Sequence, residues 1–269
     1  KSFGDRYAGR ALYCLFYEPS FLTRTSFERA IGLLGGTAYH TEDASQFYPV
    51  KTPNHIDNIT GILASLHIDL VVLRSSEEGV VDRAAEVNAL PIINGGSLGD
   101  HPTQALADLY TLRRELGSID GKRVGIVGRL EHRNVSALLK GLALFDRVSV
   151  TLIPFSGNLD PEVTEYCEGR GMRLTVEDDI EAVADADAIY LNGPRTVAHM
   201  QLLRSRGSFN LRINEEFMSM LKPHCVILDP MQRSGDFVVD VEDPRLAFYR
   251  QAKDALFVRM GLLTTILSR

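Results

Sequence analysis

The sequence predicts an α/β protein with two doubly wound, parallel-sheet domains joined by a short hinge. Along its 269 residues, short apolar runs alternate with segments of helical periodicity. The apolar runs are rich in Val, Ile and Leu, which is typical of parallel strands covered by helices on both faces. The length suits one large or two medium domains, at ~100–200 residues each. We therefore expect two domains of this kind.

The expected strands are 11–17, 37–41, 69–73, 90–94, 123–127, 148–153, 173–176, 188–191 and 225–228. The expected helices are 27–34, 56–66, 79–87, 103–116, 135–145, 161–169, 178–184 and 214–221. In the first helix the apolar residues fall on one face, and Gly35-Gly36 closes it.

The domain boundary is expected in the turn-rich segment 117–121, because the strand–helix rhythm restarts at Lys122. The predicted domains are 1–118 and 119–269. A final helix, 244–267, has apolar residues along most of its length. We expect it to pack back on the first domain.

Composition excludes several classes of protein. Net charge is −6 and no basic run is long enough to track a nucleic-acid backbone, so we expect no nucleic-acid partner. No apolar stretch approaches the ~20 residues of a membrane span. No signal peptide is visible. Cys14, Cys167 and Cys225 lack metal-site spacing and are expected to be buried free thiols in a reducing compartment.

The opening loop, 18–26, carries the first site prediction. It joins a buried strand to a helix N-terminus and contains Ser20, Thr23 and Arg24. Backbone N–H groups, the helix dipole, hydroxyls and a guanidinium together favour an anion, and a phosphate fits best. An ordinary N-cap, formed by Thr25 or Ser26, explains the same residue types.

Four further loops follow predicted strands, where ligands of open α/β sheets bind. Arg74 ends a strand and can hold an anion, or form a surface ion pair. A glycine-rich loop leads to His101 and Gln104 at a helix N-terminus, whose dipole favours a neutral imidazole that donates to a carbonyl oxygen. A lone histidine is more often structural. Two loops of the second domain, 129–134 and 229–234, complete the set.

A dinucleotide-binding oxidoreductase is weakly supported. The segment Gly125-Ile126-Val127-Gly128-Arg129 does not match the Gly-x-Gly-x-x-Gly fingerprint.

Several motifs in order resemble the catalytic chain of the aspartate/ornithine carbamoyltransferase family, on its aspartate branch. They are Glu18-Pro19-Ser20, Ser26-Phe27-Glu28, Leu34-Gly35-Gly36, Arg74, His101-Pro102-Thr103-Gln104 and the ending 250–263. The resemblance runs from about residue 12 to 267. It implies transfer of a carbamoyl group from carbamoyl phosphate to an amino-acid acceptor, with no cofactor or metal. It also implies a cytoplasmic homotrimer with shared sites, and a chain of the pyrimidine pathway as a candidate partner.

The resemblance also implies roles for individual residues. Thr23, Arg74 and His101 would hold the carbamoyl oxygen, and Gln104 the carbamoyl nitrogen. Ser20, Thr23 and Arg74 would hold the phosphate. Lys51 would act in a neighbouring subunit's site. Arg133 and Arg195 would hold the acceptor's carboxylates, and the backbone carbonyl of Met231 its nitrogen.

Three parts of the sequence depart from the family pattern, and one of them is Val197, which stands where the family has Gln, with one extra residue before Arg195. Phe21 and Leu22 replace the first threonine and arginine of Ser-Thr-Arg-Thr-Arg-x-Ser-Phe, and the Phe21 ring is expected to fill space at the site. Losing a charge-assisted contact to the phosphate costs on the order of 2–5 kcal/mol. Asp229 and Gln232 alter the family's His-Pro-Leu-Pro-Arg loop.

Two hypotheses of different classes remain open at this point. One is a carbamoyltransferase with a weakened phosphate site and an altered acceptor. The other is a catalytically silent homologue that keeps the trimer and serves as a binding, scaffold or regulatory partner. Retention of Lys51, Arg74, His101, Gln104 and Arg133 favours the enzyme.

Overall fold

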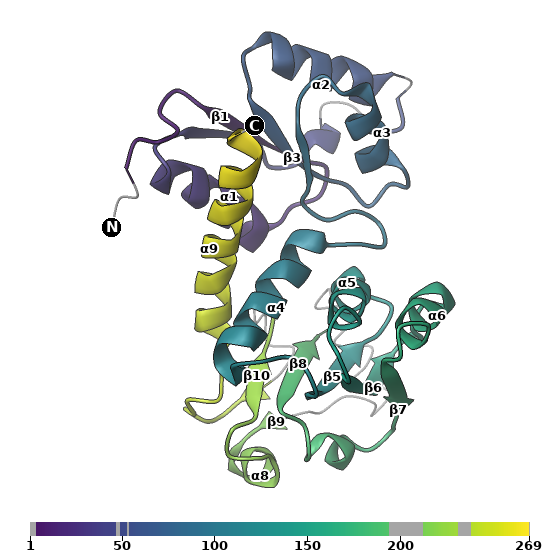
Figure 1. The fold of residues 1–269 in the computed structure, drawn as a ribbon. Coiled ribbons are helices and arrows are strands. Elements are labelled where there is room, and N and C mark those ends of the chain that lie inside the picture. Colours follow the sequence, from purple (N-terminus) through teal and green to yellow (C-terminus); the bar gives the residue numbers. More distant parts are fainter. Residues whose placement is uncertain (1–3, 47–48, 53, 194–211, 231–237, 269) are drawn as a thin grey trace. The chain divides into compact units, whose positions relative to one another are not determined.

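The computed structural model describes residues 4–46, 49–52, 54–193, 212–230 and 238–268. It confirms the predicted fold class, with parallel sheets and helices on both faces of each main sheet (Figure 1). By its packing the chain divides into two compact units, Lys1–Thr103 with Lys253–Arg269, and Gln104–Ala252. The boundary expected near residue 118 stays a prediction. None of the helices in the described ranges combines the length and the apolar composition of a transmembrane span.

The first unit contains a four-stranded parallel sheet in the order β2-β1-β3-β4. Its strands are β1 (Ala11–Phe16), β2 (Thr37–Thr41), β3 (Leu70–Arg74) and β4 (Ile92–Asn94). Its helical elements are α1 (Phe21–Leu33), η1 (Ala44–Gln46), α2 (His55–Ser65), α3 (Val80–Val87) and, from Lys253 onward, α9 (Phe248–Leu267).

Each face of this sheet has its own core. On one face, Phe27 of α1 and Leu263 of α9 belong to the same buried cluster as Val72 of β3. On the other, Leu63 of α2 and Ala84 of α3 pack with the sheet. Burial of this apolar surface, worth ~25 cal/mol per Å², fixes the C-terminal part of α9 on the first sheet, as predicted.

The second unit contains a five-stranded parallel sheet in the order β10-β8-β5-β6-β7, and a two-stranded sheet, β11-β9. Its strands are β5 (Arg123–Arg129), β6 (Ser149–Ser156), β7 (Arg173–Val176), β8 (Ala188–Asn192), β9 (Arg212–Ile213), β10 (Val226–Leu228) and β11 (Val238–Val239). Its helical elements are α4 (Pro102–Leu116), α5 (Arg133–Leu142), α6 (Pro161–Glu168), η2 (Ile180–Val183) and α8 (Glu215–Met220).

Three expectations about elements are corrected. The helix expected at 178–184 is a 3₁₀ segment, η2. Strands β9 and β11 were not expected, because two residues are too few to give a periodic pattern. The last helix was expected to begin at residue 244 but begins at Phe248. The Ile227 N–H donates to the Arg245 carbonyl, and the Ala247 N–H donates to the Ile227 carbonyl, each at 2.8 Å. Residues 245–247 therefore extend alongside β10 before the helix starts.

Candidate active site

Three polar side chains of the first unit converge on one point. Nε2 of His101 lies 3.4 Å from Nη1 of Arg74 and 3.5 Å from Oγ1 of Thr23. The strand register explains why they meet, because Phe16 at the end of β1 pairs with Arg74 at the end of β3. The loop after β1 and the arginine therefore share one edge of the sheet. Thr23 and His101 are buried and the Arg74 side chain is only partly exposed, so bulk water has little access to the three groups.

Arg74 is oriented by a carboxylate to which the sequence alone assigned no role. Its Nε lies 3.2 Å from Oε1 of Glu18, and both side chains are 13% exposed. Oε2 of Glu18 accepts from the Ser76 hydroxyl at 2.7 Å. Nη1 of Arg74 donates to the Gly95 carbonyl at 3.1 Å. Glu18 lies two residues before Ser20 in the opening loop. Its position just after a predicted strand is the feature of the sequence from which a role at the site could have been predicted.

The glycine-rich loop before α4 holds His101 in place. Oδ1 of Asn94 accepts from the Gly96 N–H at 2.8 Å, and the Ser97 N–H donates to the Asp100 carbonyl at 2.8 Å. Gly96 has a φ of +123°, which L side chains rarely adopt. The turn therefore requires glycine at this position, and it delivers His101 to the start of the helix.

The opening segment has the predicted strand–loop–helix order, but α1 begins at Phe21 and not at residue 27, so Thr23, Arg24 and Ser26 lie within the first turns of α1. Its N-cap is Ser20, with extended backbone and no side-chain capping bond, so the N-cap interpretation through Thr25 or Ser26 is wrong. The Ser26 hydroxyl instead donates to the Thr23 carbonyl at 3.0 Å. Helix N-terminal N–H groups that receive no side-chain cap remain suited to an anion.

The two altered positions of this loop lie in the first turn of α1. The Phe21 side chain is 62% exposed and Leu22 is half-buried. Much of Phe21 is therefore accessible, and the expectation that its ring fills space at the site stays a prediction. Arg24, expected to contribute to anion binding, is instead ion-paired with Glu28 at 3.6 Å and with Glu42. Two carboxylates there neutralise its charge.

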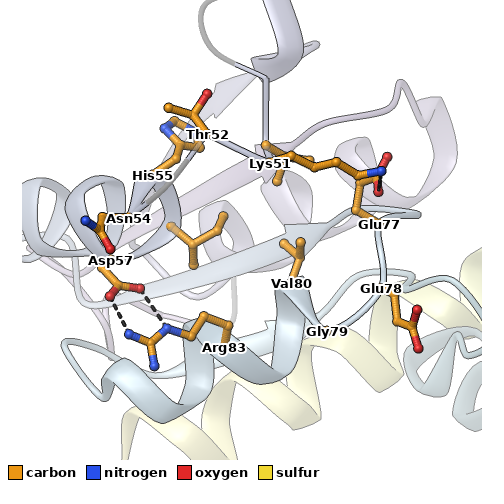
Figure 2. Close-up of a pocket in the computed structure, with 12 residues that line it drawn as sticks. Lys51, Thr52, Asn54, His55, Asp57, Glu77, Glu78, Gly79, Val80 and Arg83 are labelled. Atoms are coloured by element: carbon orange, nitrogen blue, oxygen red, sulfur yellow. Dashed lines mark hydrogen bonds and ion pairs between the residues drawn. The ribbon is translucent and has the colours of Figure 1, made fainter.

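Lys51 lines a pocket of the first unit that does not include Thr23, Arg74 or His101. Figure 2 shows it beside Glu77, whose Oε2 is 2.9 Å from the lysine Nζ. The hydrogen bond and charge of Glu77 raise the pKa of Lys51. The pocket has a volume of about 710 Å³, and an ion pair between Arg83 and Asp57 lies on its wall. Because the Lys51 side chain is 76% exposed, its ion pair with Glu77 contributes little to the stability of the fold.

In the second unit, Gln104 bonds to a buried carboxylate on its own helix. Its Nε2 donates to Oδ1 of Asp108 at 2.8 Å. Gln251 donates to the same oxygen at 2.7 Å, and the Tyr190 hydroxyl donates to Oδ2 at 2.8 Å. Burial and then the Asp108 charge raise the pKa of Tyr190, so the phenol stays protonated and donates. Asp108 was missed in the sequence, although it lies one helical turn after Gln104.

The acceptor-side residues are only partly described. Arg133 is buried at the first position of α5, after the N-cap His132, whose Nδ1 accepts from the Asn134 N–H at 3.3 Å. Asp229, directly after β10, is also buried, and its N–H donates to Oε1 of Gln251 at 2.9 Å.

Three predicted residues, Arg195, Met231 and Gln232, lie outside the described residues. Among the residues that the structure places, no group of three or more His, Cys, Asp or Glu is arranged to hold a metal ion. All three cysteines are free and buried, as expected.

Comparisons with known proteins decide the family. Residues 1–114 match the model of the aspartate/ornithine carbamoyltransferase carbamoyl-P binding domain. Residues 120–266 match the model of the Asp/Orn binding domain of the same enzymes. The chain belongs to the aspartate/ornithine carbamoyltransferase family.

Members with known sequences cover nearly the whole chain. Aspartate carbamoyltransferase 2 of Pisum sativum is 35% identical over 268 residues, which are 96% of this chain and 69% of that protein. The aspartate carbamoyltransferase catalytic subunit of Pyrobaculum arsenaticum is 33% identical, covering all of this chain and 89% of that one. These relatives lie on the aspartate branch of the carbamoyltransferases.

Solved structures of carbamoyltransferases have the same fold. The M. jannaschii aspartate transcarbamoylase catalytic subunit superposes with a TM-score of 0.84 at 28% identity, covering 98% of this chain and 87% of that one. Trypanosoma cruzi aspartate transcarbamoylase, solved with carbamoyl aspartate and phosphate, gives a TM-score of 0.82 at 28% identity, with 96% and 83% covered.

Proposed function

We propose that this carbamoyltransferase-family chain transfers the carbamoyl group of carbamoyl phosphate to the amino group of a small amino acid. The observation that carries the proposal is the convergence of Arg74 and Thr23 on Nε2 of His101, at 3.4 and 3.5 Å. One carbonyl oxygen placed among these groups would accept from all three. Donors aimed at the oxygen that becomes negative usually contribute more than any other effect to the rate of acyl transfer.

The chemistry follows from this placement. The acceptor nitrogen attacks the carbamoyl carbon, the carbonyl oxygen takes the negative charge, and the C–O bond to phosphate then breaks. The phosphate leaves with the electron pair of that bond, and the proton that the amine loses ends on the released phosphate. The N-terminus of α1 supports the phosphate, through backbone N–H groups that no side chain caps. Related enzymes bound to carbamoyl phosphate and aspartate support the choice of substrates.

The finer proposal is that the phosphate site is weakened and the acceptor altered. Leu22 offers no charge at the first turn of α1, and Arg24 is already paired with carboxylates. Asp229 adds a buried negative charge after β10. We therefore expect weak binding of carbamoyl phosphate, and an acceptor with less negative charge than aspartate.

A silent homologue is the second candidate, and Leu22 is the observation that favours it. A chain that binds carbamoyl phosphate without transferring the carbamoyl group would act as a trimeric binding or regulatory partner. The chain also matches part of a much larger protein, the multifunctional protein CAD of Squalus acanthias, of which it covers 12% at 34% identity. A partner chain of the pyrimidine pathway therefore stays a candidate.

The test combines calorimetry with a carbamoylation assay. Carbamoyl phosphate is titrated into the purified protein, and product is then measured with aspartate and other amino acids. Arg74→Lys keeps the charge and loses the planar fork, so we expect kcat/KM to fall about 100-fold or more, equivalent to about 2.7 kcal/mol. Arg83→Lys, in an exposed pair with Asp57, is the matched control and should change little. Binding without any product would favour the silent homologue.

A further inference from the structure

The buried carboxylate of Asp108 fixes the direction of the Gln104 amide. Asp108 is 0% exposed, and its Oδ1 accepts from Nε2 of Gln104 at 2.8 Å. An ionised carboxylate only accepts hydrogen bonds, so the glutamine must turn its NH₂ group toward it. The amide oxygen then faces away from Asp108. Without that partner, the two ends of the amide have no such constraint.

The same carboxylate connects other parts of the second unit. Gln251 of α9 donates to Oδ1 of Asp108 at 2.7 Å, and its own Oε1 accepts from the Asp229 N–H at 2.9 Å. Tyr190 of β8 holds Oδ2 at 2.8 Å. A carboxylate is costly to bury unless it is hydrogen-bonded, so these donors keep it in one position. Asp108 therefore holds a single rotamer from which Gln104 takes its orientation.

We propose that Asp108 is a positioning residue that makes Gln104 selective for the amino group of the carbamoyl donor. This rests on the proposed function and on the role that the family resemblance implies for Gln104, which is to hold the carbamoyl nitrogen. An NH₂ group on the donor needs an acceptor, and the outward amide oxygen of Gln104 is one. A methyl group in the same place would leave that oxygen without a bond. The hydrogen bonds of Asp108 thus make the site bind carbamoyl phosphate more tightly than other acyl phosphates of the same size.

Acetyl phosphate is the probe that isolates this contact, because it carries CH₃ where carbamoyl phosphate carries NH₂. Calorimetry measures the ratio of the two dissociation constants for the unmodified protein and for Asp108→Ala, Asp108→Asn and Thr111→Val. Asn keeps an oxygen for Gln104 and turns its NH₂ toward the Tyr190 hydroxyl. Thr111→Val is the structural control, since it removes another buried side-chain donor of α4, which bonds to the Ala107 carbonyl at 2.9 Å.

We expect the unmodified protein, Asp108→Asn and Thr111→Val to prefer carbamoyl phosphate over acetyl phosphate. Asp108→Ala should lose about ten-fold of that preference, the factor that about 1.4 kcal/mol of hydrogen bonding gives, while its affinity for acetyl phosphate stays the same. Equal loss for both ligands, or no loss, overturns the inference. If Asp108→Ala does not fold, Asp108→Ser replaces it, because serine bonds to its own helix and falls short of Gln104.

Failure of the proposed function gives a different result. An unmodified protein that binds neither acyl phosphate overturns the proposed function and the inference together. An unmodified protein that binds both, with a ratio that Asp108→Ala leaves unchanged, overturns the inference alone.

Discussion

Nη1 of Arg74 lies 3.4 Å from Nε2 of His101, which joins the end of β3 to the residue before α4. Arginine only donates, so a hydrogen bond between these atoms makes Nε2 the acceptor and leaves the imidazole proton on Nδ1. That nitrogen is 3.5 Å from Oγ1 of Thr103. A carbonyl oxygen bound at this point needs a proton on Nε2 instead. Donor binding is therefore expected to change the tautomer of His101.

The first prediction concerns the phosphate loop. Replacing Phe21 by Thr and Leu22 by Arg should tighten carbamoyl phosphate binding ten-fold or more, because it returns a charge-assisted contact to the first turn of α1. Calorimetry on the double variant and on Leu22→Arg alone measures the effect. Leu66→Arg adds the same charge at an exposed residue after α2 and should leave the affinity unchanged. Equal affinity in the double variant and the unmodified protein would show that this loop does not face the ligand.

The second prediction concerns the acceptor. One like charge at ~4 Å, with an effective dielectric of ~20, costs up to about 4 kcal/mol before screening. With Asp229 buried, aspartate should therefore be a poor acceptor compared with amino acids of lower negative charge. A panel of amino acids and amines, assayed with carbamoyl phosphate, measures this in the unmodified protein and in Asp229→His with Gln232→Pro. The double variant should gain activity toward aspartate. Ordinary efficiency with aspartate in the unmodified protein contradicts the prediction.

The third prediction concerns assembly. Among the described residues, the exposed ammonium of Lys51 pairs only with Glu77 at the surface. Breaking this ion pair so that the lysine can bind a ligand in a neighbouring chain costs little free energy. We expect a homotrimer in which Lys51 acts in the neighbour's site. Lys51→Ala and His101→Ala should each be inactive, and a mixture that is dissociated and reassembled should regain activity. Mixing either variant with itself is the control. A stable monomer in sedimentation equilibrium, or a mixture that stays inactive, would refute shared sites.

The fourth prediction concerns acid stability. Asp187 connects the starts of neighbouring strands, accepting from the Arg123 N–H at 2.9 Å, from Lys222 at 3.3 Å and from His224 at 3.1 Å. Burial raises its pKa, but these hydrogen bonds outweigh it and the pKa lies below the usual value of 3.8. At a pH just below 3.8, the unfolded chain therefore binds more protons at this carboxyl than the folded protein does. The contribution of Asp187 to the free energy of unfolding is complete above the unfolded pKa and is lost as the pH falls through the folded pKa.

Asp187→Asn tests this directly. At pH 7 the variant should lose about 1–3 kcal/mol, a fall of a few degrees in melting temperature. The difference from the unmodified protein should shrink as the pH falls below about 4. Asp185→Asn is the control, because its carboxylate is 79% exposed and pairs only with Arg123 at 3.1 Å among the described residues. A difference that does not change with pH would show that the charge of Asp187 is not what stabilises the fold.

The parallel α/β architecture and most elements of both sheets could be predicted from the order of the amino acids alone. Strands such as β3 and β5 were predicted close to their observed bounds, because buried parallel strands leave continuous apolar runs between turn residues. The sequence also predicted that Thr23, Arg74 and His101 follow strands or open helices, where parallel sheets present their ligand sites. Both kinds of inference depend on local order along the chain, which the sequence records.

Which polar groups meet depends instead on how the chain packs. Glu18 orients Arg74 because the register places the ends of β1 and β3 side by side, and no local pattern gives that register. Asp108 is buried among Gln104, Gln251 and Tyr190, which are up to 143 residues away from it in sequence. The guanidinium of Arg24 could bind an anion, yet the fold places the carboxylates of Glu28 and Glu42 beside it. Long-range pairing of charges and hydrogen bonds depends on packing, and periodicity carries no information about it.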